Sequence, residues 1–324
     1  MKKRLTLIFL VLSCFSCQKE NETKFLKLGH SLGLSHPVHI AMEFFAKRVR
    51  EKSGGKLIIE IYPSGQLGGE RESLELLQIG SLAMTKVSSA VMENFSPKLQ
   101  VFGYPYLFRD KEHRYQLYDS ELGQELLAEG KQYWLKGLTY FDAGSRSFYT
   151  KNTKITRPEN LEGLKIRVME SPTAINLVKT LGGSPTPVSW GELYTSLQQG
   201  VVDGAENNLP SFYSSRHYEI AKEFSVDEHT SIPDILVIST LIYDSLTTDE
   251  QKWLQESARE AAIKQRELWE EAETEALKEI TAAGVNITYP NKGLFREKSL
   301  VLIEDLKTRD KALYQLVQEI KELN

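Results

Sequence analysis

The sequence has few cysteines, no excess of basic residues and, beyond its first residues, no long apolar run. Only Cys14 and Cys17 are cysteines among the 324 residues, which excludes a disulfide framework or a cysteine-based zinc site from the body of the fold. The 40 Lys and Arg residues are outnumbered by 44 Asp and Glu residues, and the net charge of −4 argues against a nucleic-acid partner, which needs a positive face. With 41% apolar and 26% charged residues, the chain is typical of a folded protein of about two domains.

The N-terminus has the pattern of an export signal. Residues 2–4 are basic, and residues 5–12 form an apolar run too short to span a bilayer. A small residue directly before a cysteine, after such a run, resembles a bacterial lipobox, and both Ser16-Cys17 and Ser13-Cys14 fit it. We therefore predict a lipoprotein-type signal peptide over residues 1–16, with lipidation of Cys17 or else Cys14. The alternative is an ordinary signal peptide with incidental cysteines.

The body of the chain alternates strand and helix patterns. Apolar runs and period-two alternation predict strands, whereas apolar residues at three- and four-residue steps predict amphipathic helices. The predicted strands are 25–28, 57–61, 83–87, 100–102, 165–168, 184–188, 201–203 and 235–239, and the predicted helices are 38–49, 70–79, 173–181 and 192–199. This rhythm predicts an α/β fold with mainly parallel sheets, in which the strand at 235–239 returns to the first sheet.

Residues 248–283 predict an unusually long helix. The segment opens on Thr248-Asp249-Glu250, a plausible helix start, and contains no Gly or Pro before Gly284. At 1.5 Å per residue it would be about 50 Å long, which is longer than a small domain is wide. Such a helix bridges two lobes or forms a dimer. The alternative is two helices with an unmarked break between them.

Enzyme motifs are not found in the sequence. It contains no G-x-S-x-G elbow, no G-x-G-x-x-G turn and no G-x-x-x-x-G-K-[ST] loop. His36 and His39 are spaced to share a helix face as metal ligands, but no third ligand is in pattern, so a role at the helix start is favoured. Acidic pairs are abundant, yet their spacing alone does not mark a general acid and base. A hydrolase is thus left without support.

Several polar residues occupy unusual local settings. Arg167 lies inside the apolar strand 165–169, Arg146 lies between small residues, and Asn207 follows a strand. Ligands of open α/β sheets bind at the carboxyl ends of strands, and the Arg fork matches a carboxylate, so these residues indicate a binding cleft for an acid. Trp190 is suited to form an apolar wall under such a ligand. For each arginine, the alternative is an internal salt bridge with a nearby glutamate.

Four ordered runs carry a resemblance to a known family. They are YPSGQLGGERE at 62–72, PYLFRD at 105–110, LEGLKIRV at 161–168, and PTPVSWGELY at 185–194 continuing to DGAEN at 203–207. With these runs the sequence resembles the extracytoplasmic solute receptors of TRAP transporters, of the DctP type, along nearly the whole mature chain.

The resemblance implies an α/β, two-lobed, periplasmic-binding-protein-like fold with a long lobe-spanning helix. Lobe I would comprise residues 25–144 plus 234–273, and lobe II residues 145–233 plus 274–324. The lobes would close on a small organic acid and deliver it to a separate TRAP membrane permease. We accordingly expect a periplasmic receptor held to the membrane only by a lipid anchor, with no enzymatic activity, cofactor, metal or nucleic-acid partner.

The resemblance also implies roles for individual residues. In that family, the arginine of the KIRV strand grips the ligand carboxylate, an earlier arginine and the asparagine of the DGAEN run assist, an aromatic residue packs on the ligand, and a glutamate of the first run faces the cleft. The matching residues here are Arg167, Arg146, Asn207, Trp190 and Glu72, with Ser88, His36 and Asp234 at positions of specificity contacts.

The nature of the ligand follows from the charges around it. Glu72 and Asp234 would repel a second carboxylate, whereas both accept hydrogen bonds from hydroxyls. Trp190 suits the apolar face of a sugar ring. The sequence therefore favours a sugar acid such as a hexuronate. A C4-dicarboxylate is the alternative within the family, and a secreted enzyme acting on acidic sugars is the alternative outside it.

Overall fold

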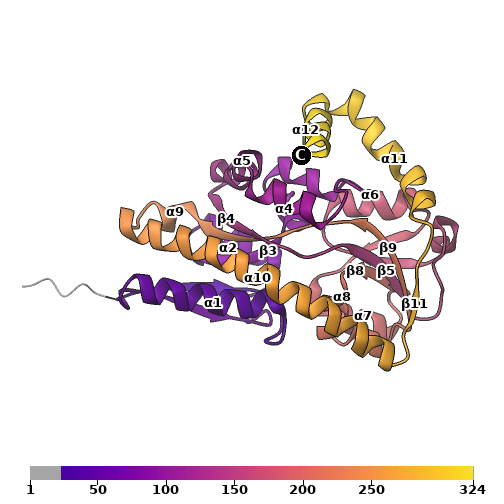
Figure 1. The fold of residues 1–324 in the computed structure, drawn as a ribbon, viewed down its shortest axis with the longest axis horizontal. Helices are drawn as coiled ribbons and strands as arrows, with labels where there is room; N and C mark the ends of the chain where they lie inside the picture. Colours follow the sequence, from indigo (N-terminus) through magenta and orange to yellow (C-terminus); the bar gives the residue numbers. More distant parts are fainter. Residues whose placement is uncertain (1–22, 324) are drawn as a thin grey trace, which may run out of the picture.

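The computed structural model describes residues 23–323 and shows two α/β lobes, each built around one sheet (Figure 1). The predicted signal peptide, Cys14 and Cys17 lie outside the described residues. Within residues 23–323, no helix combines the length and the apolar character that a membrane span requires.

The first lobe is built on a five-stranded sheet of order β2-β1-β3-β10-β4. Strand β1 runs parallel to β2 and β3, whereas β10 runs antiparallel to β3 and β4. The strands are β1 (Lys24–Gly29), β2 (Leu57–Tyr62), β3 (Met84–Ser88), β4 (Leu135–Phe141) and β10 (Asp234–Ser239). Every residue of β10 is buried, which explains its uninterrupted apolar sequence. The predicted return of this strand to the first sheet is confirmed.

The second lobe is built on a six-stranded sheet of order β11-β9-β5-β8-β6-β7. Its strands are β5 (Arg146–Thr150), β6 (Lys165–Val168), β7 (Ser184–Pro187), β8 (Gly204–Asn207), β9 (Glu223–Thr230) and β11 (Asn286–Thr288). Strand β5 runs antiparallel to both of its neighbours, β8 and β9. Both sheets are therefore mixed, and the prediction of mainly parallel sheets is wrong because β5 and β10 cross back between the lobes.

Two of the predicted strands are not strands. Residues 100–102 lie in the 3₁₀ helix η1 (Pro97–Gly103), and residues 201–203 form a bend that precedes β8. A short apolar run does not distinguish a strand from a buried helical turn, and in η1 the apolar residues Leu99, Val101 and Phe102 are all buried. At the second position, Gly200 adopts a left-handed conformation that ends the preceding helix, and Val201 is exposed.

The remaining helices flank the sheets. They are α1 (Pro37–Lys52), α2 (Glu70–Gln78), α3 (Ser89–Met92), α4 (Lys111–Asp119), α5 (Glu121–Glu129), α6 (Pro172–Leu181), α7 (Leu193–Gln199), α8 (Leu209–Ser214), α9 (Thr240–Tyr243), α10 (Thr248–Ala282), α11 (Lys292–Arg309) and α12 (Lys311–Glu322), with the short 3₁₀ helices η2 (Gly130–Tyr133), η3 (Pro158–Leu161), η4 (Trp190–Glu192) and η5 (His217–Glu219).

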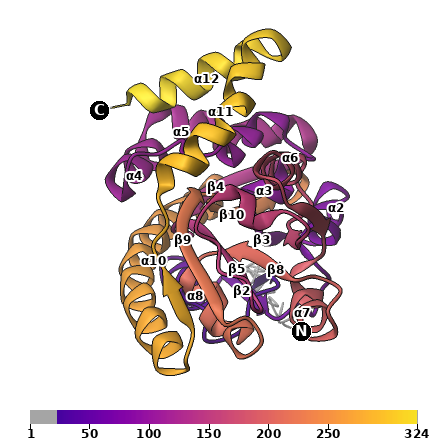
Figure 2. The ribbon, with the colours of Figure 1, turned by 90° about the vertical axis from the view of Figure 1, so that its right-hand side faces the viewer.

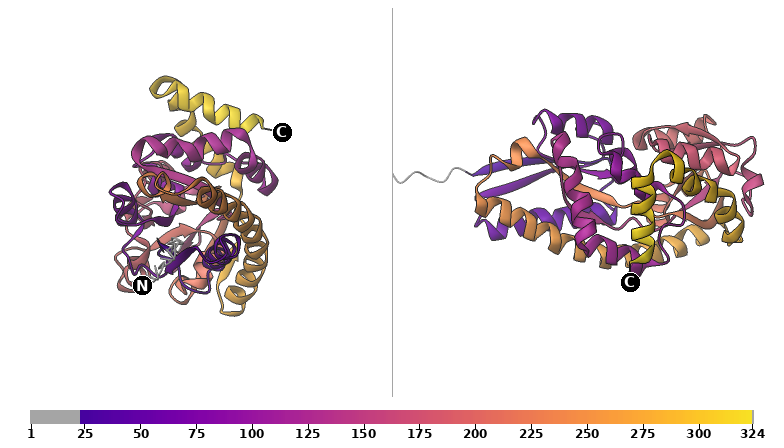
Figure 3. Two further views of the ribbon diagram at one scale, coloured as in Figure 1. Left: turned by 90° about the vertical axis from the view of Figure 1, so that its left-hand side faces the viewer. Right: turned by 90° about the horizontal axis from the view of Figure 1, so that it is seen from above.

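Helix α10 spans both lobes as one continuous helix of 35 residues (Figures 1 and 3). Thr247 caps its start and forms a reciprocal pair of hydrogen bonds with Glu250. The helix packs on α1 in the first lobe and on α8 in the second. The prediction of an unbroken lobe-spanning helix is confirmed.

The C-terminal helix α12 packs on the first lobe, although the predicted boundaries place residues 274–324 in the second. Leu313, Val317 and Ile320 belong to the same buried apolar cluster as residues of η1, and His113 of α4 contacts the Ile320 carbonyl oxygen through Nε2 at 2.8 Å. Figure 2 shows α12 beside α4 and α5. The chain therefore crosses between the lobes once more than the predicted boundaries allow.

Candidate functional site

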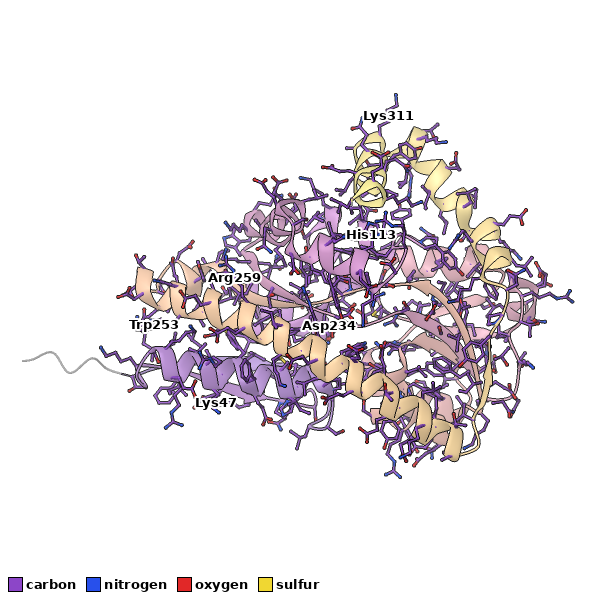
Figure 4. All side chains as sticks on the ribbon, viewed as in Figure 1. Lys47, His113, Asp234, Trp253, Arg259 and Lys311 are labelled. Atoms are coloured by element: carbon purple, nitrogen blue, oxygen red, sulfur yellow. The ribbon has the colours of Figure 1, made fainter. Side chains whose placement is uncertain are left out.

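A cavity of about 290 Å³ lies between the two lobes. The first lobe contributes the turn and helix start at residues 64–72 and the end of β3, and the second contributes β6, the segment 188–191 and the end of β8. Asp234, at the start of β10, lines the cavity near the middle of the molecule (Figure 4). Seven of the eight predicted contact residues line it: Arg167, Arg146, Asn207, Trp190, Glu72, Ser88 and Asp234.

Arg167 is a buried cation that lacks an acidic partner among the described residues. Its Nε donates to the Val188 carbonyl oxygen at 2.8 Å, while its Nη1 is buried with no hydrogen-bond partner. Burial lowers the pKa of this guanidinium from its usual value. An unsatisfied guanidinium nitrogen in a cavity wall is costly unless an anion meets it. The geometry of Arg167 therefore suits a ligand carboxylate.

Arg146, in contrast, is largely occupied by neighbouring residues. Its Nη2 donates to the Glu206 carboxylate at 2.9 Å and to the Glu206 carbonyl oxygen at 2.7 Å, its Nε donates to the same carboxylate, and its Nη1 donates to Asn207 Oδ1 at 2.8 Å. The internal salt bridge considered from the sequence is thus present at Arg146. One Nη1 hydrogen is left for a ligand, because a guanidinium has five N–H donors.

The Arg146–Glu206 pair belongs to a larger buried charge network. His229 Nδ1 lies 2.6 Å from Asp227 Oδ2, and its Nε2 lies 3.6 Å from Glu206 Oε2. Burial alone would lower the pKa of His229, but the carboxylates of Asp227 and Glu206 outweigh it and raise the pKa to about 9. For Glu206, burial is outweighed by Arg146 and His229, so its pKa falls to about 2. The two cations and two anions hold Arg146 at the cavity wall.

Asn207 and Trp190 complete the wall around Arg167. Asn207 Oδ1 accepts hydrogen bonds from Arg146 and from the Asn208 backbone N–H, which orients the amide and directs its N–H₂ group elsewhere. The Trp190 ring lies 6.0 Å from the guanidinium carbon of Arg167, and its side chain packs on apolar residues of both lobes. Together these groups provide a cation, an amide donor and an apolar face.

The opposite wall is rich in carboxylates. Asp234 and Glu70 both pair with Lys86, whose Nζ lies 3.1 Å from Asp234 Oδ1 and 2.8 Å from Glu70 Oε1. Burial would lower the pKa of Lys86, but the two carboxylates raise it, so the ammonium stays charged. Glu72 lines the cavity from the exposed side of α2, and Ser88 lines it from the end of β3. This wall carries three carboxylates and one ammonium.

Lys86, Glu70 and Ser211 line the cavity but were missed from the sequence. A signal existed for Lys86, because it interrupts the apolar strand β3 in the same way that Arg167 interrupts β6. No local pattern marks Glu70 or Ser211, since each resembles an ordinary helix residue.

His36 does not line the cavity. It caps the start of α1, accepting from the Val38 backbone N–H at 3.2 Å, and its Nε2 lies 3.1 Å from Ser211 Oγ, which does line the cavity. The predicted role at a helix start is confirmed, whereas a contact between His36 and the ligand stays a prediction. In the part of the chain that the structure describes, no group of three or more His, Cys, Asp or Glu residues is arranged to hold a metal ion.

Comparison with known proteins places this site in context. Residues 28–309 match the sequence model of the bacterial extracellular solute-binding proteins, family 7. The chain is 40% identical over 320 residues to the protein YiiZ of Salmonella typhimurium, covering 96% of each chain.

Solved structures show the same fold. A TRAP periplasmic solute-binding protein from a Bradyrhizobium species, in complex with D-galacturonate, is 35% identical with a TM-score of 0.89 over 92% of this chain and 100% of that one. One from Chromohalobacter salexigens, with bound D-glucuronate, is 31% identical with a TM-score of 0.89 over the same shares of the two chains.

Proposed function

The chain belongs to the bacterial extracellular solute-binding proteins of family 7, and on that premise we propose that it binds a sugar acid such as a hexuronate for a TRAP transporter. The carboxylate of the ligand binds Arg167 and Asn207 in the cavity between the lobes. The ligand then passes to a separate membrane permease.

The observation that carries this proposal is the contrast between the two walls of the cavity. The wall of the second lobe presents the unpaired Nη1 of Arg167, whereas the wall of the first lobe presents Glu70, Glu72 and Asp234. A ligand with one carboxylate and several hydroxyls satisfies both walls, since hydroxyls donate to carboxylates. A C4-dicarboxylate would place its second charge against the acidic wall.

Two solved relatives support the same ligand class, because their bound molecules are galacturonate and glucuronate. The cavity volume of about 290 Å³ is at the lower end of the range for small-molecule sites, which suits a single sugar ring. Trp190 would pack against the apolar face of that ring.

A receptor role also fits the chemistry of the cavity better than an enzymatic one. The solved relatives are receptors, and the site's cations, Arg146 and Lys86, are tied to carboxylates within the protein. We therefore propose that the ligand leaves unchanged. Incubation of the mature protein with galacturonate or oligogalacturonate, followed by chromatography, tests this directly, and any turnover would support the enzyme instead.

The ligand is best identified by a thermal-shift screen followed by calorimetric titration. The screen includes galacturonate, glucuronate and an open-chain sugar acid, with succinate and malate as C4-dicarboxylates. A ligand present at 100 times its Kd adds about 2.7 kcal/mol to the free energy of unfolding, which is a readily measured shift. Stabilisation by the dicarboxylates alone would overturn the proposed ligand class while leaving the family unaffected.

We further propose that the protein acts in the periplasm and is held there by a lipid on Cys17 or Cys14. The basic and apolar start of the sequence supports export, and the small residue before each cysteine supports lipidation. Mass spectrometry of the mature N-terminus from the native host decides the matter. An unmodified N-terminus cut elsewhere would contradict the lipid anchor.

A further inference from the structure

An exposed apolar patch lies at the end of the first lobe opposite the ligand cavity. It consists of Ile79, Trp134 and Leu241, which are 69%, 52% and 48% exposed, and we call it the tip patch. Helix α2 and strand β10 both lead from the cavity to this patch, because Glu70 and Asp234 line the cavity at one end while Ile79 and Leu241 follow the other end.

Backbone contacts hold the three side chains of the tip patch together. The Thr240 N–H donates to the Trp134 carbonyl oxygen at 3.0 Å, and Gln78 Nε2 donates to the Tyr133 carbonyl oxygen at 3.1 Å. A side chain on Gly80 would meet Leu241 Cδ1 at 3.5 Å, so Leu241 lies directly over the turn that follows Ile79. The patch is therefore a fixed feature assembled from three separate segments.

Trp134 adopts a strained backbone conformation within the patch. Its φ of +61° is in the left-handed region, where it ends η2 at a position that glycine or asparagine usually fills. A bulky residue is unfavourable there, and strain of this kind gathers at functional positions. The conformation holds the indole half in solvent, where it gains little from burial.

Two lysines flank the tryptophan without ion-pair partners. Lys131 and Lys136 form no ion pair with any residue in the range 23–323 for which the structure gives contacts, and the ammonium of Lys136 lies 4.9 Å from the centre of the Tyr243 ring. Partial burial lowers the pKa of Lys136, and the positive charge of Lys131 lowers it further, against a weaker opposite effect of Asp244. Two adjacent ammonium groups favour an anionic partner such as phosphate.

The described chain begins at this same end of the lobe (Figure 1). Lys24 Nζ lies 2.8 Å from Glu250 in the first turn of α10, and Gln251 of that turn donates to the Tyr243 carbonyl oxygen of α9. Cys17 precedes Thr23 by only six residues, which reach at most about 20 Å when fully extended. A lipid on Cys17 would therefore hold the tip patch near the bilayer surface.

We propose that the tip patch binds the surface of an anionic lipid bilayer. Trp134 would sit at the level of the headgroups with Ile79 and Leu241 beside it, while Lys131 and Lys136 would contact lipid phosphates. Such contacts add to a single lipid chain, which binds a membrane only weakly by itself. The proposal uses the proposed lipid anchor for orientation only, because the patch can be tested without any lipid on the protein.

The test uses the mature polypeptide from residue 18 onward, produced without lipid, and its sedimentation with vesicles. Vesicles of equal parts phosphatidylglycerol and phosphatidylethanolamine should bind it, vesicles of phosphatidylcholine should bind it less, and added salt should weaken binding. In Trp134→Gly, binding should fall roughly tenfold, as expected for the loss of one interfacial aromatic side chain. Glycine relieves the strained φ, so the variant should fold at least as stably as the wild type.

A matched control lies on α10, where Ile263 is 62% exposed outside the patch. Ile263→Ser should bind vesicles like the wild type, and Lys131→Gln should reduce both binding and its dependence on salt. Equal binding of Trp134→Gly and wild type would overturn the proposal. So would a loss of transport in vesicles containing the permease with lipid binding unchanged, because the patch would then contact the permease. Affinity for the sugar acid, measured on the same variants, tests the proposed function separately.

Discussion

Arg146 donates from Nη2 to the Glu206 carboxylate at 2.9 Å, and both side chains are buried in the wall of the ligand cavity. Arg167 lies in the same wall without such a partner, since its Nη1 has none within residues 23–323. The two arginines therefore divide two tasks. Arg146 belongs to the structure of the wall, whereas Arg167 is left for the ligand.

Replacement of Arg167 should abolish tight binding with little loss of stability. Truncating one member of a buried charge pair costs about 2–5 kcal/mol, or roughly 30- to several-thousand-fold in Kd. Arg167→Lys should not restore affinity, because an ammonium does not form two parallel hydrogen bonds. Calorimetric titration measures the Kd, and the melting temperature of the ligand-free protein should not fall. Near-normal affinity in folded Arg167→Ala would remove Arg167 from the site.

Replacement of Arg146 should produce the opposite balance of effects. Arg146→Ala leaves the buried Glu206 carboxylate without its cation, which typically costs about 3–5 kcal/mol of stability. Denaturant unfolding of the ligand-free protein measures this loss. The double variant Arg146→Met with Glu206→Gln removes both charges, so it should recover part of the stability. An Arg146→Ala protein as stable as the wild type would show that the pair is not structural.

The His229 network should make stability depend on pH. The pKa of His229 is raised to about 9 in the folded protein, so its stabilising contribution is complete below the unfolded value of 6.5 and is lost as the pH rises through 9. Glu206, with a pKa lowered to about 2, contributes fully above its unfolded value of 4.5 and loses that contribution as the pH falls through 2. The melting temperature should therefore decline between pH 6.5 and 9, and His229→Gln should flatten this decline. An unchanged slope in His229→Gln would contradict the assigned charge.

Glu93 joins the two lobes and should affect ligand affinity from outside the cavity. It follows α3 in the first lobe, and its carboxylate accepts from Ser171 Oγ at 2.7 Å and from the Thr173 N–H at 3.0 Å at the start of α6 in the second lobe. Loss of a helix cap costs about 0.5–2 kcal/mol, so Glu93→Ala should raise the Kd by about 2- to 30-fold if closure forms these bonds. Small-angle scattering of the ligand-bound variant should show a larger radius of gyration.

The control for Glu93 is Asp110→Ala, since Asp110 caps α4 by accepting from the His113 N–H entirely within the first lobe. This variant should lose stability without a change in Kd. Equal effects of Glu93→Ala and Asp110→Ala on Kd would show that the contact between the lobes has no special role in binding.

Glu72 should select against a second carboxylate on the ligand. It lines the cavity from an exposed position, so Glu72→Gln changes its charge at little cost to folding. The variant should bind succinate or malate more tightly than the wild type does, while uronate binding weakens. Titration with both ligand classes measures the ratio of the two affinities. A ratio that does not change would place the discrimination at Asp234 or Glu70 instead.

The sequence by itself determined the features that depend on neighbouring residues. Most strands and helices were predicted, as was the continuous α10, because apolar periodicity and caps act over a few residues. Arg167 was also recognisable, since a charge inside the apolar strand β6 requires a specific partner. The failures within this class were short apolar runs such as residues 100–102, where strand and helical turn share one pattern.

The tertiary structure decided which groups meet across the chain. Glu206 lies 60 residues beyond Arg146, and Asp234 lies 148 residues beyond Lys86, so no local pattern shows that these charges pair. The path of the chain likewise turned His36 away from the cavity and placed α12 on the first lobe. Burial removes water from around a charge and makes its partner decisive, and only the folded chain determines which partner is within reach.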